Sequence, residues 1–148
     1  MSSKNILKLM KDKEIEFVDF RFTDPRGKLQ HLTMDATIVD DEMLEEGVFF
    51  DGSSIAGWKA INESDMILKP DLARPIVDPF NSHNTLNIFC DILDAVKKEP
   101  YERDPRGTAK KAENYLKKSG VGDKAYFGPE PEFFTFDDVR FENKMNSS

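Results

Sequence analysis

Two glutamates stand two residues apart inside an apolar and aromatic run, residues 127–136. Side chains alternate between the two faces of a strand, so Glu130 and Glu132 are expected on the same side of a strand over residues 125–136. Neighbouring ionised carboxylates repel each other and lose hydration in apolar surroundings, so they need a positive partner. Carboxylate oxygens suit Mg²⁺ or Mn²⁺. The pair therefore predicts a metal site; the alternative is a solvated polar face on an edge strand.

A second group of polar residues occupies the stretch FFDGSSIAGW at residues 49–58. Its glycines let backbone approach a ligand closely, while Asp and Ser supply hydrogen-bond acceptors and a donor. An ionised Asp51 on such a loop can bind a cation such as ammonium, or accept a proton from it. The spacing of a nucleophilic serine, G-x-S-x-G, is absent. The alternative is an ordinary Asx turn with no ligand.

Composition excludes several classes of protein. The 148 residues carry a formal charge of −7, 39% apolar residues and 12 Phe, which argues against both a disordered chain and a general nucleic-acid binder. The apolar runs are too short to span a membrane and the N-terminus lacks a signal-peptide pattern, so we expect a cytoplasmic protein without a membrane partner. The single cysteine, Cys90, is expected to pack as a small hydrophobe. His31 and His83 are expected as surface or hydrogen-bonded residues rather than ligands.

The elements that must position these groups follow from periodicity and turn signals. Ser3 is expected as the N-cap of a helix that runs to about Lys13, and Asp40 or Asp41 is expected to cap a second short helix that ends at Gly47. The turn signal at residues 24–27 joins two strands into a hairpin. The strands are expected at residues 14–22, 28–34, 65–69, 75–77 and 85–93, and residues 49–58 are expected as a loop. This order suits an α+β fold in which a small mixed sheet grasps a helix, the β-grasp arrangement.

A change of pattern near residues 95–102 predicts a domain boundary. We expect an N-terminal helix at 1–14, a β-grasp domain at 15–97 and the start of a second domain at 98–148. Asp104 and Pro105 are typical of a helix start, and Gly120 is typical of its end. The strand that carries the two glutamates follows this helix, and the polar C-terminal residues are expected to fray.

Taken together, six strings resemble, in family order, the bacterial-type (type I) glutamine synthetases. They run from about residue 15 to residue 141. The strings are FVDFRFTD at 17–24, FDGSSI at 50–55, GW at 57–58, INESDM at 61–66, DPR at 104–106 and FGPEPEFF at 127–134.

The resemblance implies an ATP-dependent ligase that joins glutamate and ammonia through γ-glutamyl phosphate. It implies a β-grasp domain, then the first helix and strand of a catalytic domain that holds two or three Mg²⁺ or Mn²⁺ ions. By the resemblance, Glu130 and Glu132 are ligands of different ions, Asp51 helps to bind and deprotonate ammonium, and Ser54 lies beside it. It further implies a homo-oligomer with stacked rings and an active site between subunits.

The other metal ligands, the glutamate-binding arginines and the nucleotide pocket lie downstream in this family. We therefore expect an N-terminal piece that is inactive alone, binds metal weakly, and exposes Phe133, Phe134 and Phe136. Two alternatives remain: a non-catalytic β-grasp interaction module, and another metal-dependent phosphotransferase that shares a carboxylate strand.

Overall fold

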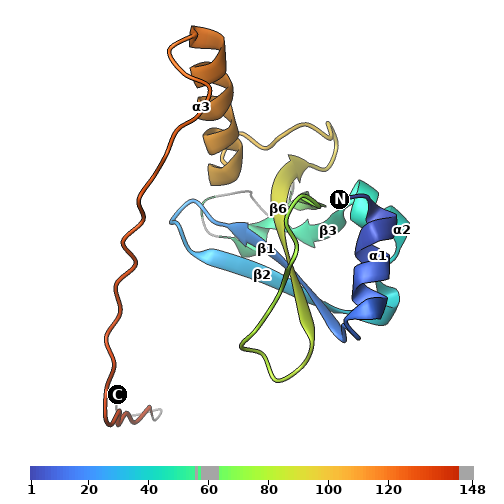
Figure 1. Cartoon of the computed structure of the whole chain (residues 1–148), viewed down its shortest axis with the longest axis vertical. Coiled ribbons are helices and arrows are strands. Elements are labelled where there is room, and N and C mark those ends of the chain that lie inside the picture. Colours follow the sequence, from blue (N-terminus) through green and yellow to red (C-terminus); the bar gives the residue numbers. More distant parts are fainter. Residues whose placement is uncertain (56, 58–63, 144–148) are drawn as a thin grey trace.

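The computed structural model describes residues 1–55, 57 and 64–143. Two helices lie on one side of a mixed sheet, a third helix projects from it, and the C-terminal segment runs clear of the sheet (Figure 1). The elements are α1 (Ser3–Asp12), β1 (Phe17–Thr23), β2 (Leu29–Asp35), α2 (Asp41–Glu46), β3 (Val48–Asp51), β4 (Asp65–Pro70), β5 (Ile76–Val77), β6 (Thr85–Asp94) and α3 (Pro105–Ser119).

The sheet has the order β2-β1-β6-β4-β3, and β5 pairs with β6 outside this path. β1 forms the predicted antiparallel hairpin with β2, and it pairs with β6 in parallel. The second half of β6 pairs antiparallel with β4, which pairs with β3. The first and last strands of the sheet thus lie side by side at its centre, and the predicted β-grasp arrangement is confirmed.

One face of this sheet makes the core with α1 and α2. Alternate residues of β1 and β6 point into it, as period-2 patterning predicts. The core includes Ile6 and Met10 of α1, Val18, Phe20 and Phe22 of β1, Leu44 of α2, and Leu86, Ile88, Cys90 and Ile92 of β6. Cys90 is only 1% exposed, and burial raises the pKa of its thiol well above the usual value. The expectation that Cys90 packs as a small hydrophobe is confirmed.

The N-cap of α1 differs from the predicted one, whereas α2 is capped as expected. The side chain of Ser2, not Ser3, caps α1 by accepting a hydrogen bond from the Asn5 N–H. Ser3 is buried, and its hydroxyl donates to the Glu45 carboxylate at 2.7 Å, which joins α1 to α2. For α2, Asp40 is the N-cap. Gly47 ends α2 at φ 98°, a conformation that favours glycine.

Two predictions about strands are wrong. Residues 48–51 form β3 rather than part of a loop, because this short stretch pairs with β4 over its whole length. Residues 125–136 are extended but form no strand. A strand needs a neighbour for its N–H and C=O groups, and no described segment pairs with this one. Phe133, Phe134 and Phe136 are 84%, 87% and 70% exposed, as expected for an unpaired segment.

Helix α3 is anchored to the sheet at its N-terminus. The carboxylate of Asp104 is 1% exposed and accepts hydrogen bonds from the N–H of Ile92 at 3.2 Å and of Arg106 at 3.0 Å. Burial raises the pKa of this carboxyl. The Arg106 guanidinium donates to Asp91 at 2.8 Å and also pairs with Asp71. Beyond its first turn the helix is almost entirely exposed. In the part of the chain that the structure describes, no helix is long and apolar enough to cross a membrane.

The buried cap predicts a specific effect of substituting Asp104. Asp104→Ala removes the N-cap of α3 and leaves the buried Ile92 N–H without an acceptor, so the free energy of unfolding should fall by about 1–3 kcal/mol. Asp104→Asn keeps an acceptor oxygen and should lose less. Urea denaturation followed by circular dichroism measures both, with the exposed Asp123→Ala as the control. Equal stability of Asp104→Ala and Asp123→Ala would contradict this role for the cap.

Candidate functional site

Asp51 lies at the end of β3, where the chain turns into a single 3₁₀ turn at Gly52–Ser54. Its side chain is exposed. One carboxylate oxygen, Oδ1, accepts the Ser53 N–H at 2.8 Å and the Ser53 hydroxyl at 2.7 Å. These two bonds, with a smaller contribution from the Ser64 hydroxyl, hold the pKa of Asp51 below its usual range. The group is therefore an oriented carboxylate, ionised at neutral pH and open to solvent.

Gly52 holds the turn after Asp51 against the sheet. Its N–H donates to the carbonyl oxygen of Ser64 at 2.7 Å, just before β4. A Cβ at Gly52 would lie 2.3 Å from the Met66 sulfur and 2.9 Å from the Ser64 oxygen, so only glycine fits without displacing β4. Two residues before Gly52, the centre of the Phe50 ring lies 5.3 Å from the centre of the Phe22 ring. The Asp51 turn is thus held by packing on both sides of the carboxylate.

The neighbouring serines have different positions. Ser53 contacts Asp51, whereas Ser54 is exposed. The sequence signal for Ser53 was its place two residues after an Asp, the usual spacing of an Asx turn. Trp58, the last residue of the 49–58 stretch, lies outside the described residues. Gly57 is described, and its carbonyl oxygen accepts a hydrogen bond from Arg103 at 2.9 Å.

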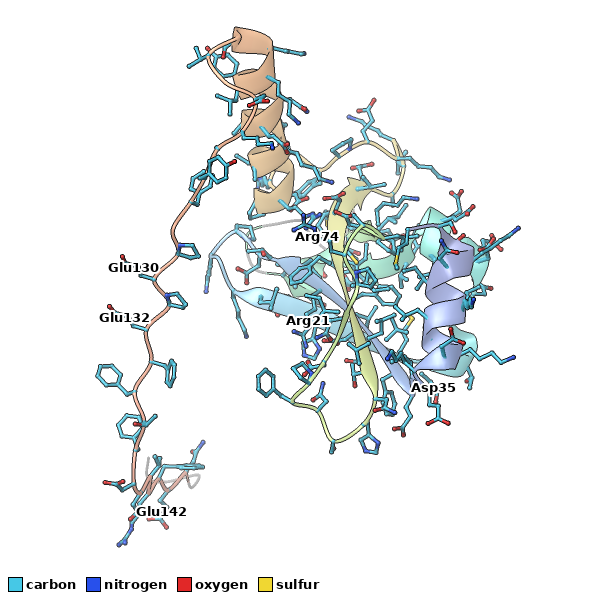
Figure 2. The ribbon with its side chains drawn as sticks, viewed as in Figure 1. Arg21, Asp35, Arg74, Glu130, Glu132 and Glu142 are labelled. Atoms are coloured by element: carbon cyan, nitrogen blue, oxygen red, sulfur yellow. The ribbon has the colours of Figure 1, made fainter. Side chains whose placement is uncertain are left out.

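Glu130 and Glu132 lie on the extended C-terminal segment and are exposed. Both side chains project to the same side of this segment (Figure 2), as expected for extended backbone. The segment runs clear of the sheet that carries Asp51 (Figure 1), so the structure does not bring the two glutamates to the turn.

The donor atoms of Glu130 and Glu132 agree only in part with a metal site. Carboxylates are the right ligand type for Mg²⁺ or Mn²⁺. Among the described residues, however, no group of three or more His, Cys, Asp or Glu side chains is placed to hold a metal ion. Glu130 and Glu132 are thus two carboxylates of the right type with no third such side chain placed beside them in the described part of the chain.

A polar network on the open face of the sheet was not anticipated. Asp19 of β1 is 5% exposed and accepts hydrogen bonds from Arg21 at 2.7 Å, His31 at 2.7 Å and Thr33 at 2.6 Å. Burial alone would raise the pKa of Asp19, but these three bonds outweigh it and the pKa is lowered. The network borders a shallow hollow of about 340 Å³. Since Asp19 is satisfied by its neighbours, we assign the network a structural role.

Both histidines are hydrogen-bonded surface residues, as expected. His31 pairs with Asp19, and His83 lies 3.0 Å from the Glu16 carboxylate. Their side chains are 62% and 63% exposed.

Fold and site together define a β-grasp domain with a carboxylate turn at the end of an edge strand, followed by the start of a second unit. Comparison with known families agrees with this class. Residues 14–95 match the family described as "Glutamine synthetase, beta-Grasp domain", and residues 102–148 match "Glutamine synthetase, catalytic domain". The chain belongs to the glutamine synthetase family.

Individual relatives support the assignment. The glutamine synthetase of Rhizobium meliloti (strain 1021) is 60% identical over 141 residues, which cover 95% of this chain and 30% of the relative. That of Escherichia coli (strain K12) is 52% identical over 148 residues, or 100% of this chain and 32% of the relative. The Plasmodium falciparum glutamine synthetase structure has a TM-score of 0.72 at 27% identity, covering 81% of this chain and 23% of that one. The chain thus spans about a third or less of these relatives.

The close packing at Gly52 gives a prediction about stability. Gly52→Ala forces a methyl group into Met66 and the Ser64 carbonyl, so the free energy of unfolding should fall by about 1–3 kcal/mol. Gly128→Ala is the matched control, because a Cβ there meets no atom within 4 Å. Urea denaturation of both variants measures the difference. An equal effect at the two glycines would show that the Asp51 turn is not held by this contact.

Proposed function

We propose that this chain is the N-terminal part of a glutamine synthetase, an ATP-dependent ligase that joins glutamate and ammonia through γ-glutamyl phosphate. The observation that carries the proposal is the match of both glutamine synthetase family models, in order along the chain, with relatives of that name at 52% and 60% identity. The oriented carboxylate of Asp51 supplies a chemical group that the reaction needs. Residues 1–14, 15–97 and 98–148 are proposed as the N-terminal helix, the β-grasp domain and the start of the catalytic domain.

Asp51 is proposed to bind ammonium and then take its proton, with Ser54 beside the bound cation. An exposed carboxylate with a lowered pKa is ionised at neutral pH and attracts a cation. The same lowered pKa makes it a weak base, so it favours binding over early deprotonation. Ammonium has no lone pair, so it must pass one proton to Asp51 before its nitrogen can attack the carbonyl carbon of the acyl phosphate and expel phosphate.

Glu130 and Glu132 are proposed to ligate different Mg²⁺ or Mn²⁺ ions when the rest of the ligand set is present. Such ions screen the negative charges that phosphoryl transfer to a carboxylate brings together. ATP and glutamate are proposed to bind residues beyond this chain. A homo-oligomer with the active site between subunits is also proposed: the Asp51 turn would then serve a neighbour's metal-bearing segment, which agrees with the separation of the two within one chain. A cytoplasmic location is part of the same proposal.

A chimera tests the activity. The matched part of the Rhizobium meliloti relative is replaced by this chain's residues, and glutamine formation from glutamate, ammonium and ATP is measured. The chimera should be active, because the replaced part is 60% identical. The 148-residue chain alone should form no glutamine. Asp51→Asn in the chimera should lower kcat/KM for ammonium by about a hundredfold or more.

Asp123→Asn is the control in the chimera, since Asp123 is exposed and belongs to no proposed site. Glutamine formation by the 148-residue chain alone would contradict the proposal that the site is incomplete. A folded and assembled chimera without activity would contradict the proposed function and favour a non-catalytic β-grasp interaction module.

Metal titration tests the incomplete ligand set. Because two exposed carboxylates lack further protein ligands here, Mn²⁺ should bind the 148-residue chain no more tightly than about 0.1 mM. Paramagnetic broadening of amide signals near residues 130–132 measures binding in wild type, Glu130→Ala and Glu132→Ala, with the exposed Glu102→Ala as the control. Tight binding that either of the first two variants abolishes would show a more complete site.

A further inference from the structure

Resting on the proposed function, we infer that Ser53 is a positioning residue for the ammonium site. Its side chain fixes the orientation and charge of the Asp51 carboxylate. The resemblance to the family drew attention to Ser54, but the geometry around the carboxylate assigns the orienting role to the preceding serine.

The contacts at Ser53 are directional and short. Its N–H and its hydroxyl both donate to the same oxygen of Asp51, Oδ1, at 2.8 and 2.7 Å. Two donors on one oxygen restrict the rotation of the carboxylate plane, and the Ser64 hydroxyl makes a smaller contribution to the same carboxylate. Ser54 is exposed, and no hydrogen bond joins it to Asp51 in the described structure. The carboxylate is thus preorganised from the side of Ser53.

The backbone of the turn is rigid enough to make this orientation useful. Gly52 is buried between Asp51 and Ser53, and its N–H donates to the Ser64 carbonyl at 2.7 Å. Met66 fills the space where a side chain at Gly52 would lie. Because Gly52, between the acceptor and the donors, is hydrogen-bonded to Ser64 and packed against Met66, Ser53 holds the carboxylate in a turn that is attached to the sheet.

The same chain contains a matched turn elsewhere. Asp35, at the end of β2, accepts the N–H of Thr37 at 2.8 Å and its hydroxyl at 2.6 Å. The pKa of Asp35 is lowered by these bonds, as that of Asp51 is by Ser53. The Asp35 turn shows that threonine supports the same geometry. It therefore predicts that Ser53→Thr preserves the function of Ser53, and it gives an internal reference for measurements on Asp51.

The decisive measurement uses the 148-residue chain and does not depend on activity. The carboxyl ¹³C signals of Asp51 and Asp35 are followed by NMR as pH is lowered in wild type, Ser53→Ala, Ser53→Thr and Ser54→Ala. The titration midpoint of Asp51 should move upward in Ser53→Ala and return to the wild-type value in Ser53→Thr. The Asp51 midpoint in Ser54→Ala, and the Asp35 midpoint in all four proteins, should stay in place.

An unchanged Asp51 midpoint in folded Ser53→Ala would overturn the inference, and so would an equal shift in Ser54→Ala. The amide spectrum of each variant shows whether the turn is folded, and if Ser53→Ala is not folded, the smaller change Ser53→Cys is titrated instead. Cysteine keeps the backbone N–H of residue 53 and replaces the hydroxyl by a thiol, which is a weaker hydrogen-bond donor. The inference therefore requires an upward shift of the Asp51 midpoint in Ser53→Cys too.

The chimera carries the inference into catalysis. Ser53→Ala should raise KM for ammonium several-fold, more strongly at the acidic end of the pH profile, where a higher pKa leaves less Asp51 ionised. KM for glutamate and ATP should not change, and Ser53→Thr should restore the KM for ammonium. An unaltered KM for ammonium in an active Ser53→Ala chimera would overturn the role in catalysis. An inactive wild-type chimera would count against the proposed function alone, because the NMR titration decides the positioning role independently.

Discussion

The rest of the structure depends on the pairing of β6 with both β1 and β4. Its alternate residues, among them Ile88 and Ile92, are fully buried. A slip of one residue would turn Asn87 and Asp91 into the core, so the register of β6 is strongly specified. Through β4 this register places β3 and the Asp51 turn. Through the bond from the Ile92 N–H to Asp104 it places the start of α3. One strand thus positions both the Asp51 turn and the start of α3.

The two groups of candidate site residues differ in how they are held. The Asp51 turn has backbone pairing, a buried glycine and two donors on one oxygen, so its carboxylate is oriented within this chain. Glu130 and Glu132 have neither strand partners nor a third carboxylate nearby among the described residues. Under the proposed function, the first group is complete in itself, and the second group requires further ligands. This contrast fits a site assembled between separate parts of an oligomer.

Local signals accounted for most of the fold. The Asp24 turn, the Asp40 and Asp104 caps and the helix ends at Gly47 and Gly120 were predicted, because each depends on residues within one turn of the chain. β3 was missed because a short stretch between two glycines has too few residues for periodicity to show. Its strand character comes from β4, which lies 14 residues further along the sequence by the pairing of Asp51 with Asp65. The burial of Asp19 was also missed, because it too depends on a neighbouring strand. Two of the three hydrogen-bond donors to Asp19, His31 and Thr33, come from β2.

By itself, the sequence determined the β-grasp class, the family, and the residue types at Asp51, Glu130 and Glu132 that suit cation chemistry. These follow from the alternation of apolar and polar residues, the turn residues and the order of the motifs, all of which depend only on positions in the sequence. Only the tertiary structure decided that Ser53 is the serine that contacts Asp51, that Asp104 is buried against β6, and that residues 125–136 stay unpaired. Each of these depends on which backbone and side-chain groups meet in space, because hydrogen bonds are satisfied by neighbours in three dimensions and not by neighbours in sequence.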